Sequence, residues 1–404
     1  MGKIELDHTG SGSGITLSSD GTDLLLDGTA IGGGGGAALE LYDENASTPT
    51  ANTVTGSNSA AIGENLTVSG DNSLAAGTGG TATGYSSFAF GDGADATANH
   101  SVAIGGGAIQ ASGAQSIAIG YGSDATNSDA HAFGRNANAS GSSATALGRD
   151  AVAASTRAVS IGDSYASGTD SFAAAIANNS SSYGATGANS IAMGINSKAT
   201  ATGVAIGNAA QATTNYAYSI GFGSIASGNY SFAAGRDTTA SARGTVALGE
   251  ASLANLQGKM SFAASRFAAQ GDAQSGTFVL RSDTTDATAE ALTTSNSTAG
   301  TTNQIILPNN SAYAFHGTIV ARQQASGGTA CAAWKVEGLI RREGSAGTTV
   351  LVNSATTVLD NTPSWGMALS ADTTNGGLAI TVTGAASTNI RWVATIHTSE
   401  VTYA

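Results

Sequence analysis

Large apolar residues recur along the middle of the chain at a nearly fixed spacing, each within the same five-residue phrase. Clear copies are Ser101–Gly105 (SVAIG) and Ser116–Gly120 (SIAIG). Fifteen copies run from Ser59 to Ser265, and their closing positions are 63, 77, 91, 105, 120, 134, 148, 162, 175, 194, 207, 221, 235, 249 and 265. Most steps are 14 residues, and the longer step to Gly194 marks an insertion at Asn178–Tyr183. Such self-similarity predicts a solenoid.

A second, smaller motif follows half a period later, as in Ala111–Gly113 and Ala139–Gly141. Two short extended segments per 14 residues predict one flat coil of a parallel β-roll, with glycine at its corners. Because side chains alternate between the two faces of a strand, Ser101 and Ala103 share one face and Val102 and Ile104 share the other. A coil this thin has room only for small residues. We therefore expect alanine and serine inside and the large apolar residues outside.

The outward residues would form a continuous apolar stripe, which is an aggregation hazard for a monomer. The stripe therefore favours packing of several copies on one axis as a closed cyclic oligomer. The residues expected at this interface are Ile62, Phe90, Val102, Ile104, Ile117, Ile119, Phe133, Leu147, Ile161, Ile191, Met193, Val204, Ile206, Ile220, Phe232, Val246 and Leu248.

The repeated phrase resembles the head domain of trimeric autotransporter adhesins over about half of the chain. This resemblance implies a left-handed parallel β-roll and a homotrimer. Periodicity alone predicts only an oligomeric β-roll.

From Gly276 the repeats stop and longer strands separated by turn-rich connectors are expected. The expected strands are Thr277–Ser282, Gln304–Leu307, Ala312–Gln324, Ala330–Glu343, Thr348–Leu359, Trp365–Ala371, Leu378–Thr383 and Asn389–Tyr403. Antiparallel strands at this spacing predict a jelly-roll-like β-sandwich, so that the whole chain is all-β. The three tryptophans keep phase with neighbouring apolar residues, which favours a place in the core.

The runs Phe315–Arg322, Trp334–Arg342 and Ile390–Ala394 resemble the carboxy-terminal domain of bacteriophage tail-fibre proteins. This resemblance implies a trimeric knob that binds a host receptor, either a surface glycan or an outer-membrane protein. Binding residues are expected in loops. The candidates are Asn309, Asn310, Ser326, Ser345, Asn361 and Asn375.

Four regions follow from these patterns. Residues 1–55 are acidic. They contain two expected strands, Ile15–Ser18 and Leu24–Leu26, and a glycine hinge at Gly32–Gly36. This region is predicted to attach to other tail or baseplate proteins. Residues 56–265 form the repeat shaft, 266–275 a transition and 276–404 the knob. The predicted location is the virion, after assembly in the host cytoplasm.

Charge and composition exclude several other functions. The net charge is −13 and no basic run occurs, which argues against a nucleic-acid partner. The single cysteine, Cys331, fits folding in a reducing compartment. No run of 18 apolar residues exists, so no membrane-spanning helix is expected. The beginning of the chain, Met1–His8, lacks the apolar segment of a secretory signal.

Catalytic chemistry is not evident in the sequence. The five histidines are scattered, and we expect neither a metal site nor a cofactor. The carboxylate pairs Asp92/Asp95, Asp124/Asp129 and Glu337/Glu343 are expected to be solvated turn or strand residues rather than a glycosidase pair.

The sequence therefore predicts a non-enzymatic, adhesive fibre of a bacteriophage virion. Two alternatives stay open. One is a virion-associated tailspike that depolymerises polysaccharide, and the other is a trimeric adhesin of a bacterial surface.

Overall fold

The computed structural model describes residues 50–174, 182–324 and 328–403, together with the backbone of five short strands nearer the amino terminus. The chain forms two compact units, Met1–Asp170 and Ser171–Ala404. Four of the early strands, β1 (Ile4–Leu6), β2 (Ile15–Ser19), β3 (Leu24–Leu26) and β4 (Thr29–Ile31), pair antiparallel in chain order. The two strands expected in this region are thus confirmed, whereas the glycine hinge lies outside the described residues.

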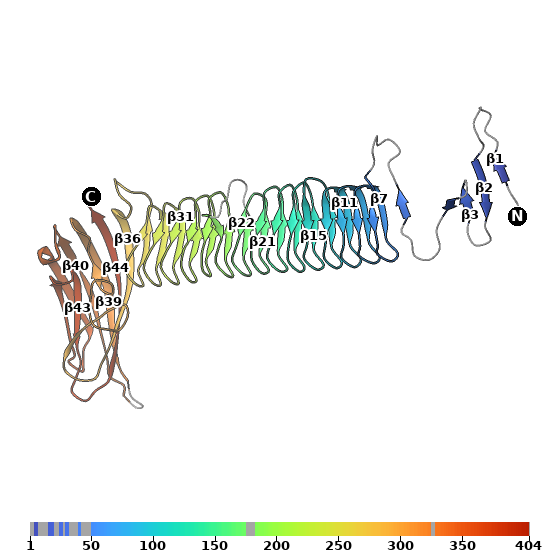
Figure 1. Ribbon diagram of the computed structural model, residues 1–404. Coiled ribbons are helices and arrows are strands. Elements are labelled where there is room, and N and C mark those ends of the chain that lie inside the picture. The colour runs from blue at the N-terminus through green and yellow to red at the C-terminus, as the bar shows by residue number, and fades with distance from the viewer. Residues whose placement is uncertain are drawn as a thin grey trace. The chain divides into compact units, whose positions relative to one another are not determined.

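In the first unit, parallel strands stack coil upon coil in two sheets (Figure 1). One sheet contains β5 (Leu39–Leu41), β7 (Ala60–Glu64), β9 (Leu74–Thr78), β11 (Phe88–Asp92), β13 (Val102–Ile104), β15 (Ile117–Ile119), β17 (His131–Phe133), β19 (Thr145–Leu147) and β21 (Val159–Ile161). The other contains β6 (Thr53–Val54), β8 (Thr67–Val68), β10 (Thr81–Ala82), β12 (Ala94–Ala96), β14 (Ile109–Ala111), β16 (Asp124–Ala125), β18 (Asn138–Ala139), β20 (Val152–Ala153) and β22 (Tyr165–Ala166).

The second unit begins with coils of the same kind. Its first sheet contains β23 (Phe172–Ala174), β25 (Ile191–Met193), β27 (Val204–Ile206), β29 (Tyr218–Ile220), β31 (Phe232–Arg236), β33 (Val246–Glu250) and β35 (Met260–Ala263). Its second contains β24 (Gly184–Ala185), β26 (Lys198–Ala199), β28 (Gln211–Ala212), β30 (Ile225–Ala226), β32 (Thr239–Ala240) and β34 (Leu253–Ala254). The parallel β-solenoid is confirmed. Most of the expected insertion at Asn178–Tyr183 lies outside the described residues.

The coil interior is filled by small side chains, as the alternation predicts. Ala103 and Ala118 are completely buried and pair directly in neighbouring coils. Ser101, at the start of the motif, is also buried, and its Oγ donates to the carbonyl oxygen of Ala98 at 2.7 Å. The motif serine therefore provides a hydrogen-bond donor for a backbone carbonyl group at the corner of the coil, where no neighbouring strand pairs with it.

Glycine closes the motif because the coils approach one another closely there. Gly91 has a φ of 131°, and a Cβ at this position would clash with the carbonyl oxygen of Gly105 in the next coil. Any other residue would meet both a backbone strain and a steric conflict at this corner.

The interior is not restricted to small residues everywhere. Ile109 is completely buried, in the coil whose step is one residue longer than the usual 14. A Cβ on Gly105 would clash with Cδ1 of Ile109, so the glycine supplies the space for this side chain. Leu66 and Val68 are buried in an earlier coil.

The last coil ends earlier than the sequence suggested. Gly249 pairs with Ala263, which places the closing position of the final copy at Ala263 and not at Ser265. The 14-residue step is thereby kept, and glycine is replaced by alanine. Strand β35 then pairs antiparallel with β36 (Ala273–Thr284), so the first sheet of the coils continues into the carboxy-terminal region within this unit.

The carboxy-terminal region is an antiparallel β-sandwich. Its larger sheet has the order β36, β44 (Ile390–Thr402), β39 (Ser311–Gln323), β40 (Cys331–Arg342) and β41 (Val350–Asp360). In the smaller sheet, β43 (Gly377–Thr383) pairs with β42 (Gly366–Asp372) on one side and with β37 (Ala289–Ala291) and β38 (Ile305–Ile306) on the other. A short 3-10 helix spans Ala346–Thr348.

All three tryptophans lie in the core between the sheets, as predicted. Trp392 stacks on Trp334 with ring centroids 5.7 Å apart and lies 5.8 Å from Trp365. The eight expected strands are present. The sequence missed β37, whose three residues, Ala289–Ala291, carry no strand signal.

Candidate functional site: an exposed apolar face and a polar cavity

One face of the coils exposes large apolar side chains. In the first unit Ile62, Phe90 and Leu147 are 45%, 53% and 47% exposed, and in the second Met193 and Ile220 are 40% and 41% exposed. All the residues predicted to form an interface lie on this outward side, and none of them is buried in the single chain. Their orientation is therefore as expected. Their role in an interface stays a prediction.

In the second unit this apolar face continues onto the sandwich. Met260 of the last coil pairs with Thr277 of β36, and both side chains point to the outer side of the sheet. The same outer side carries Val279, Val320 and Val393, each at least 41% exposed. Coil and sandwich thus share one uncovered sheet face.

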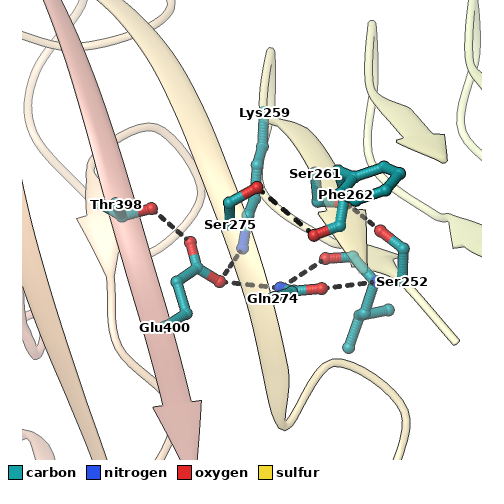
Figure 2. Close-up of polar contacts among 9 residues, drawn as sticks. Ser252, Lys259, Ser261, Phe262, Gln274, Ser275, Thr398 and Glu400 are labelled. Atoms are coloured by element: carbon teal, nitrogen blue, oxygen red, sulfur yellow. Dashed lines mark hydrogen bonds and ion pairs between the residues drawn. The ribbon is translucent and has the colours of Figure 1, made fainter. Parts of the chain in front are cut away.

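A buried ion pair joins the last coil to the final strand of the chain (Figure 2). Nζ of Lys259 lies 2.6 Å from Oε2 of Glu400, and both side chains are almost fully buried, at 1% and 0% exposure. Gln274 and Thr398 donate to the two oxygens of the same carboxylate, each at 2.7 Å. Gly276 leaves space for this carboxylate, because a Cβ there would clash with its Oε1.

Burial and the charge of Glu400 shift the pKa values of Lys259 and of the neighbouring Tyr313. Burial lowers the pKa of Lys259, and the charge of Glu400 opposes that shift. Burial also raises the pKa of Tyr313 well above its usual value, and Glu400 raises it further. Lys259 has the same position in the last coil as Thr245 has in the coil before it. No role was predicted for this lysine from the sequence.

A polar cavity lies between the end of strand β36 that is farther from the coils and the segment 290–299 that follows this strand. We call it the Asp283 cavity. Its larger hollow, of about 460 Å³, is lined by Ser282, Asp283, Glu290, Ala291, Asn296, Ser297, Thr298 and Ala299. An adjoining hollow of about 310 Å³ shares Ser282, Asp283 and Asn296 and adds Arg281, Arg391, Trp392 and Val393.

Asp283 stands at the boundary of the two hollows and is held from both sides. Its Oδ1 accepts from Nε of Arg391 at 3.3 Å, and its Oδ2 accepts from Nδ2 of Asn296 at 3.3 Å. Glu290 accepts a hydrogen bond from Oγ of Ser282 at 2.7 Å. The carboxylates therefore dominate one hollow and the guanidinium groups the other.

The cavity lies beyond the width of the coils. Strand β36 pairs with β35 only from Ser275 to Thr277. Asp283 is six residues further along the strand, about 20 Å at roughly 3.3 Å per residue. This half of the sandwich therefore overhangs the solenoid sheet (Figure 1).

The predicted binding residues lie at both ends of the sandwich. Asn309, Asn310, Ser345 and Asn375 occupy loops near the ends of strands closest to the coils, and Asn361 lies at the opposite end. The side chains of Asn361 and Asn375 bond within their own turns, to the Trp365 backbone and to Asp372. Ser326 lies outside the described residues. The binding role of the set stays a prediction.

The carboxylates considered from the sequence are dispersed. Asp95 accepts from Thr81, and Glu343 pairs with Arg341. Asp129 occupies a corner with a φ of 57°. Partial burial raises the pKa of Asp124. Among the described residues, no group of three or more histidine, cysteine, aspartate or glutamate side chains could hold a metal ion.

The Asp283 cavity was not predictable from the sequence. Arg391 is 108 residues from Asp283, and only strand pairing between β36 and β44 brings them together. Residues 283–303 contain no apolar alternation that could have predicted how this segment folds back over the sheet.

The stacked coils, with small residues inside and large residues outside, define the class of protein: a repetitive β-solenoid of the kind found in fibres and adhesins. The family model of the YadA head domain repeat matches residues 82–108, 111–137, 125–151, 139–164, 185–204, 215–238 and 226–252. The resemblance of the repeats to an adhesin head is thereby confirmed, and it fits a phage fibre built on β-roll repeats. No curated protein matches the chain by sequence.

Three solved structures with some similarity are phage tailspikes. The tailspike of Acinetobacter baumannii bacteriophage Fri1, described as a capsular polysaccharide depolymerase, is 12% identical, with 84% of this chain and 67% of that chain covered and a TM-score of 0.24. The tailspike of Acinetobacter phage vB_ApiP_P1 is 10% identical, with coverage of 91% and 82% and a TM-score of 0.22. That of Acinetobacter baumannii phage AM24 is 11% identical, with coverage of 90% and 53% and a TM-score of 0.17.

These neighbours correct one prediction. The sequence analysis expected a chain without enzymatic activity, but one of the similar structures is described as a depolymerase, so that expectation is wrong and is withdrawn. TM-scores this low transfer no catalytic residue to this chain. Within the described part of the chain, no helix has the length and apolarity needed to cross a bilayer.

Proposed function

We propose that this chain is a homotrimeric fibre or tailspike of a bacteriophage virion that adheres to the host surface through its carboxy-terminal sandwich. The observation that carries the proposal is the apolar face of the coils. A coil filled with alanine cannot take in its own Phe90 or Ile220, which are 53% and 41% exposed. Packing three such faces on one axis removes them from water. Burying a fully exposed large side chain contributes about 1.5–3 kcal/mol, so covering the exposed half of Phe90 or Ile220 contributes roughly half of that.

The remaining regions take complementary roles in this proposal. Residues 1–55 attach to other virion proteins, 56–265 form the shaft, 266–275 the transition and 276–404 the knob. The overhanging half of the sandwich supports the receptor role, because it carries a polar cavity that is not covered by the coils. Three such knobs on one rod gain avidity through effective concentration.

A labelled full-length chain tests the proposal. We expect it to sediment as a trimer, to bind bacteria that the parent phage infects and to compete with the phage for adsorption. Antibodies against the chain should decorate the virion in electron micrographs. A chain that neither binds such cells nor occurs on the virion would refute the proposal.

A second candidate function is polysaccharide cleavage, favoured by the two carboxylates, Asp283 and Glu290, that line one hollow. Adhesion and cleavage are distinguished by incubating the chain with purified host capsule and measuring released oligosaccharide. Release that is abolished by both Asp283→Asn and Glu290→Gln would establish cleavage at this cavity.

A further inference from the structure

The two hollows of the Asp283 cavity differ in charge. The larger is lined by the carboxylates of Asp283 and Glu290 together with small hydroxyl-bearing residues, and no cation lines it. The adjoining hollow shares Asp283 and adds the guanidinium groups of Arg281 and Arg391, so that two positive charges face one carboxylate there. A ligand that fills both must therefore present hydrogen-bond donors on one part and a negative charge on the part next to it.

The lining also indicates what kind of molecule fits. Its apolar lining residues are Ala291, Ala299, Val393 and Trp392. The first three are small, and the Trp392 side chain is fully buried in the core, so a peptide would find no deep pocket for an aromatic or aliphatic anchor. Two cations balanced by two carboxylates do not suit a nucleic-acid backbone, which needs a net excess of positive charge. Hydroxyl, amide, carboxylate and guanidinium groups together match the polar edges of sugars.

The hydrogen-bonding groups that remain available to a ligand agree with this division of charge between the two hollows. Glu290 accepts from Ser282 through Oε2, and carboxylates can accept several hydrogen bonds, as from neighbouring sugar hydroxyls. Arg391 uses its Nε on Asp283 and is 65% exposed, so its terminal nitrogens are accessible for a bidentate contact with a carboxylate. Arg281 lines the same hollow.

We propose that the Asp283 cavity binds an acidic oligosaccharide, with a uronate or similar carboxylate-bearing sugar against Arg281 and Arg391 and a neighbouring sugar's hydroxyl or amide donors against Asp283 and Glu290. This inference rests on the proposed function, since it specifies the class of surface glycan that the sandwich recognises.

The test uses the full-length chain on an array of purified bacterial capsular polysaccharides and O-antigens that includes uronate-containing and neutral members. The wild type should bind uronate-containing glycans and few neutral ones. Arg391→Gln should weaken that binding at least tenfold, because it removes the charged partner and leaves Asp283 to repel the ligand. Glu290→Gln should reduce binding less, because an amide can still accept a hydrogen bond.

The matched control is Arg341→Gln, which removes another exposed arginine that is paired with a carboxylate, Glu343, at the opposite end of the sandwich. Its binding should stay within twofold of the wild type. Binding confined to neutral glycans, no binding to any glycan, or equal effects of Arg391→Gln and Arg341→Gln would each overturn the inference. If the wild type still adheres to host cells in any of these cases, the proposed function survives and only the ligand class is wrong.

Discussion

The coils and the sandwich place their large apolar side chains on opposite sides of their sheets. Most coils pack alanine and serine inside and turn their large side chains outward: Ala103 is fully buried, whereas Phe90 is 53% exposed. The sandwich buries Trp334, Trp365 and Trp392 between its own two sheets. The difference arises from width: two sheets about 10 Å apart have room for aromatic rings, whereas a 14-residue coil does not.

The two regions should therefore respond differently to assembly. The sandwich has a core that it can complete within one chain. The coils depend on backbone pairing between neighbours and, in the proposed trimer, on the other two chains to cover their exposed face. Lys259 and Glu400 lie where coil and sandwich meet. There a lysine replaces the usual small polar residue of the repeat, and Glu400 of the final strand β44 neutralises its charge.

The largest expected effect follows from placing a charge on the exposed face of the coils. In the proposed trimer, Ile104→Asp brings three carboxylates to the axis, and we expect the trimer to be lost because each buried, unpaired charge costs several kcal/mol. Analytical ultracentrifugation measures the outcome. Val152→Asp, on the outward side of the second sheet, is the matched control and should remain trimeric. A stable Ile104→Asp trimer would mean that this face is exposed to water.

A smaller effect is expected at the junction. Lys259→Met leaves Glu400 buried without its cation and should lower the free energy of unfolding of the sandwich and last coil by about 3–5 kcal/mol. The double variant Lys259→Met/Glu400→Leu should recover most of that loss, because no unpaired charge remains. Chemical denaturation of the wild type, Lys259→Met, Glu400→Leu and the double variant gives the coupling energy. A double variant destabilised by the sum of the two single effects would show that the pair contributes no specific electrostatic stabilisation.

The interior of the coils predicts a third effect. Ala103→Leu forces extra methyl groups into a coil with no free space and should destabilise the first unit by about 1–3 kcal/mol. Val102→Leu, the neighbour on the outward side, is the control and should cost less than 1 kcal/mol in the monomer. Thermal unfolding of both variants provides the comparison. A tolerated Ala103→Leu would contradict the narrow interior on which the outward phasing depends.

These regions also differ in how far the sequence could predict them. Alternation within Val102–Ile104 predicted which side chains of this strand point inward and which point outward, because a strand has only two faces and the period repeats one environment. It did not predict the buried Ile109 of the following strand. The sandwich strands were predicted, but the cavity was not, since Asp283 and Arg391 meet only through long-range pairing. No role was predicted for Lys259 because the final, degenerate copy of the repeat was taken to close at Ser265, two residues after its actual closing position at Ala263.

The smallest expected effect lies in the connection between coil and sandwich. Asp272 accepts hydrogen bonds from the backbone N–H groups of Phe267, Ala268 and Ala269, at 2.7–2.9 Å. Burial acts to raise the pKa of Asp272, but these hydrogen bonds and the charge of Arg266 outweigh it and hold the pKa below its usual value of 3.8. A lowered carboxylate pKa contributes stability above the unfolded-state value, and that contribution is lost as the pH falls through the folded-state value.

Asp272→Asn should therefore cost about 1.5 kcal/mol at neutral pH, the lower end for hydrogen bonds to a charged group. The difference in unfolding free energy between wild type and variant should shrink as the pH falls below about 4, because the wild-type carboxylate is then protonated. Denaturation measured from pH 7 down to pH 3 tests both points. A difference that stays constant over this range would mean that the loop is held by the shape of the side chain and not by its charge, and the connection would then resemble the uncharged corners of the coils.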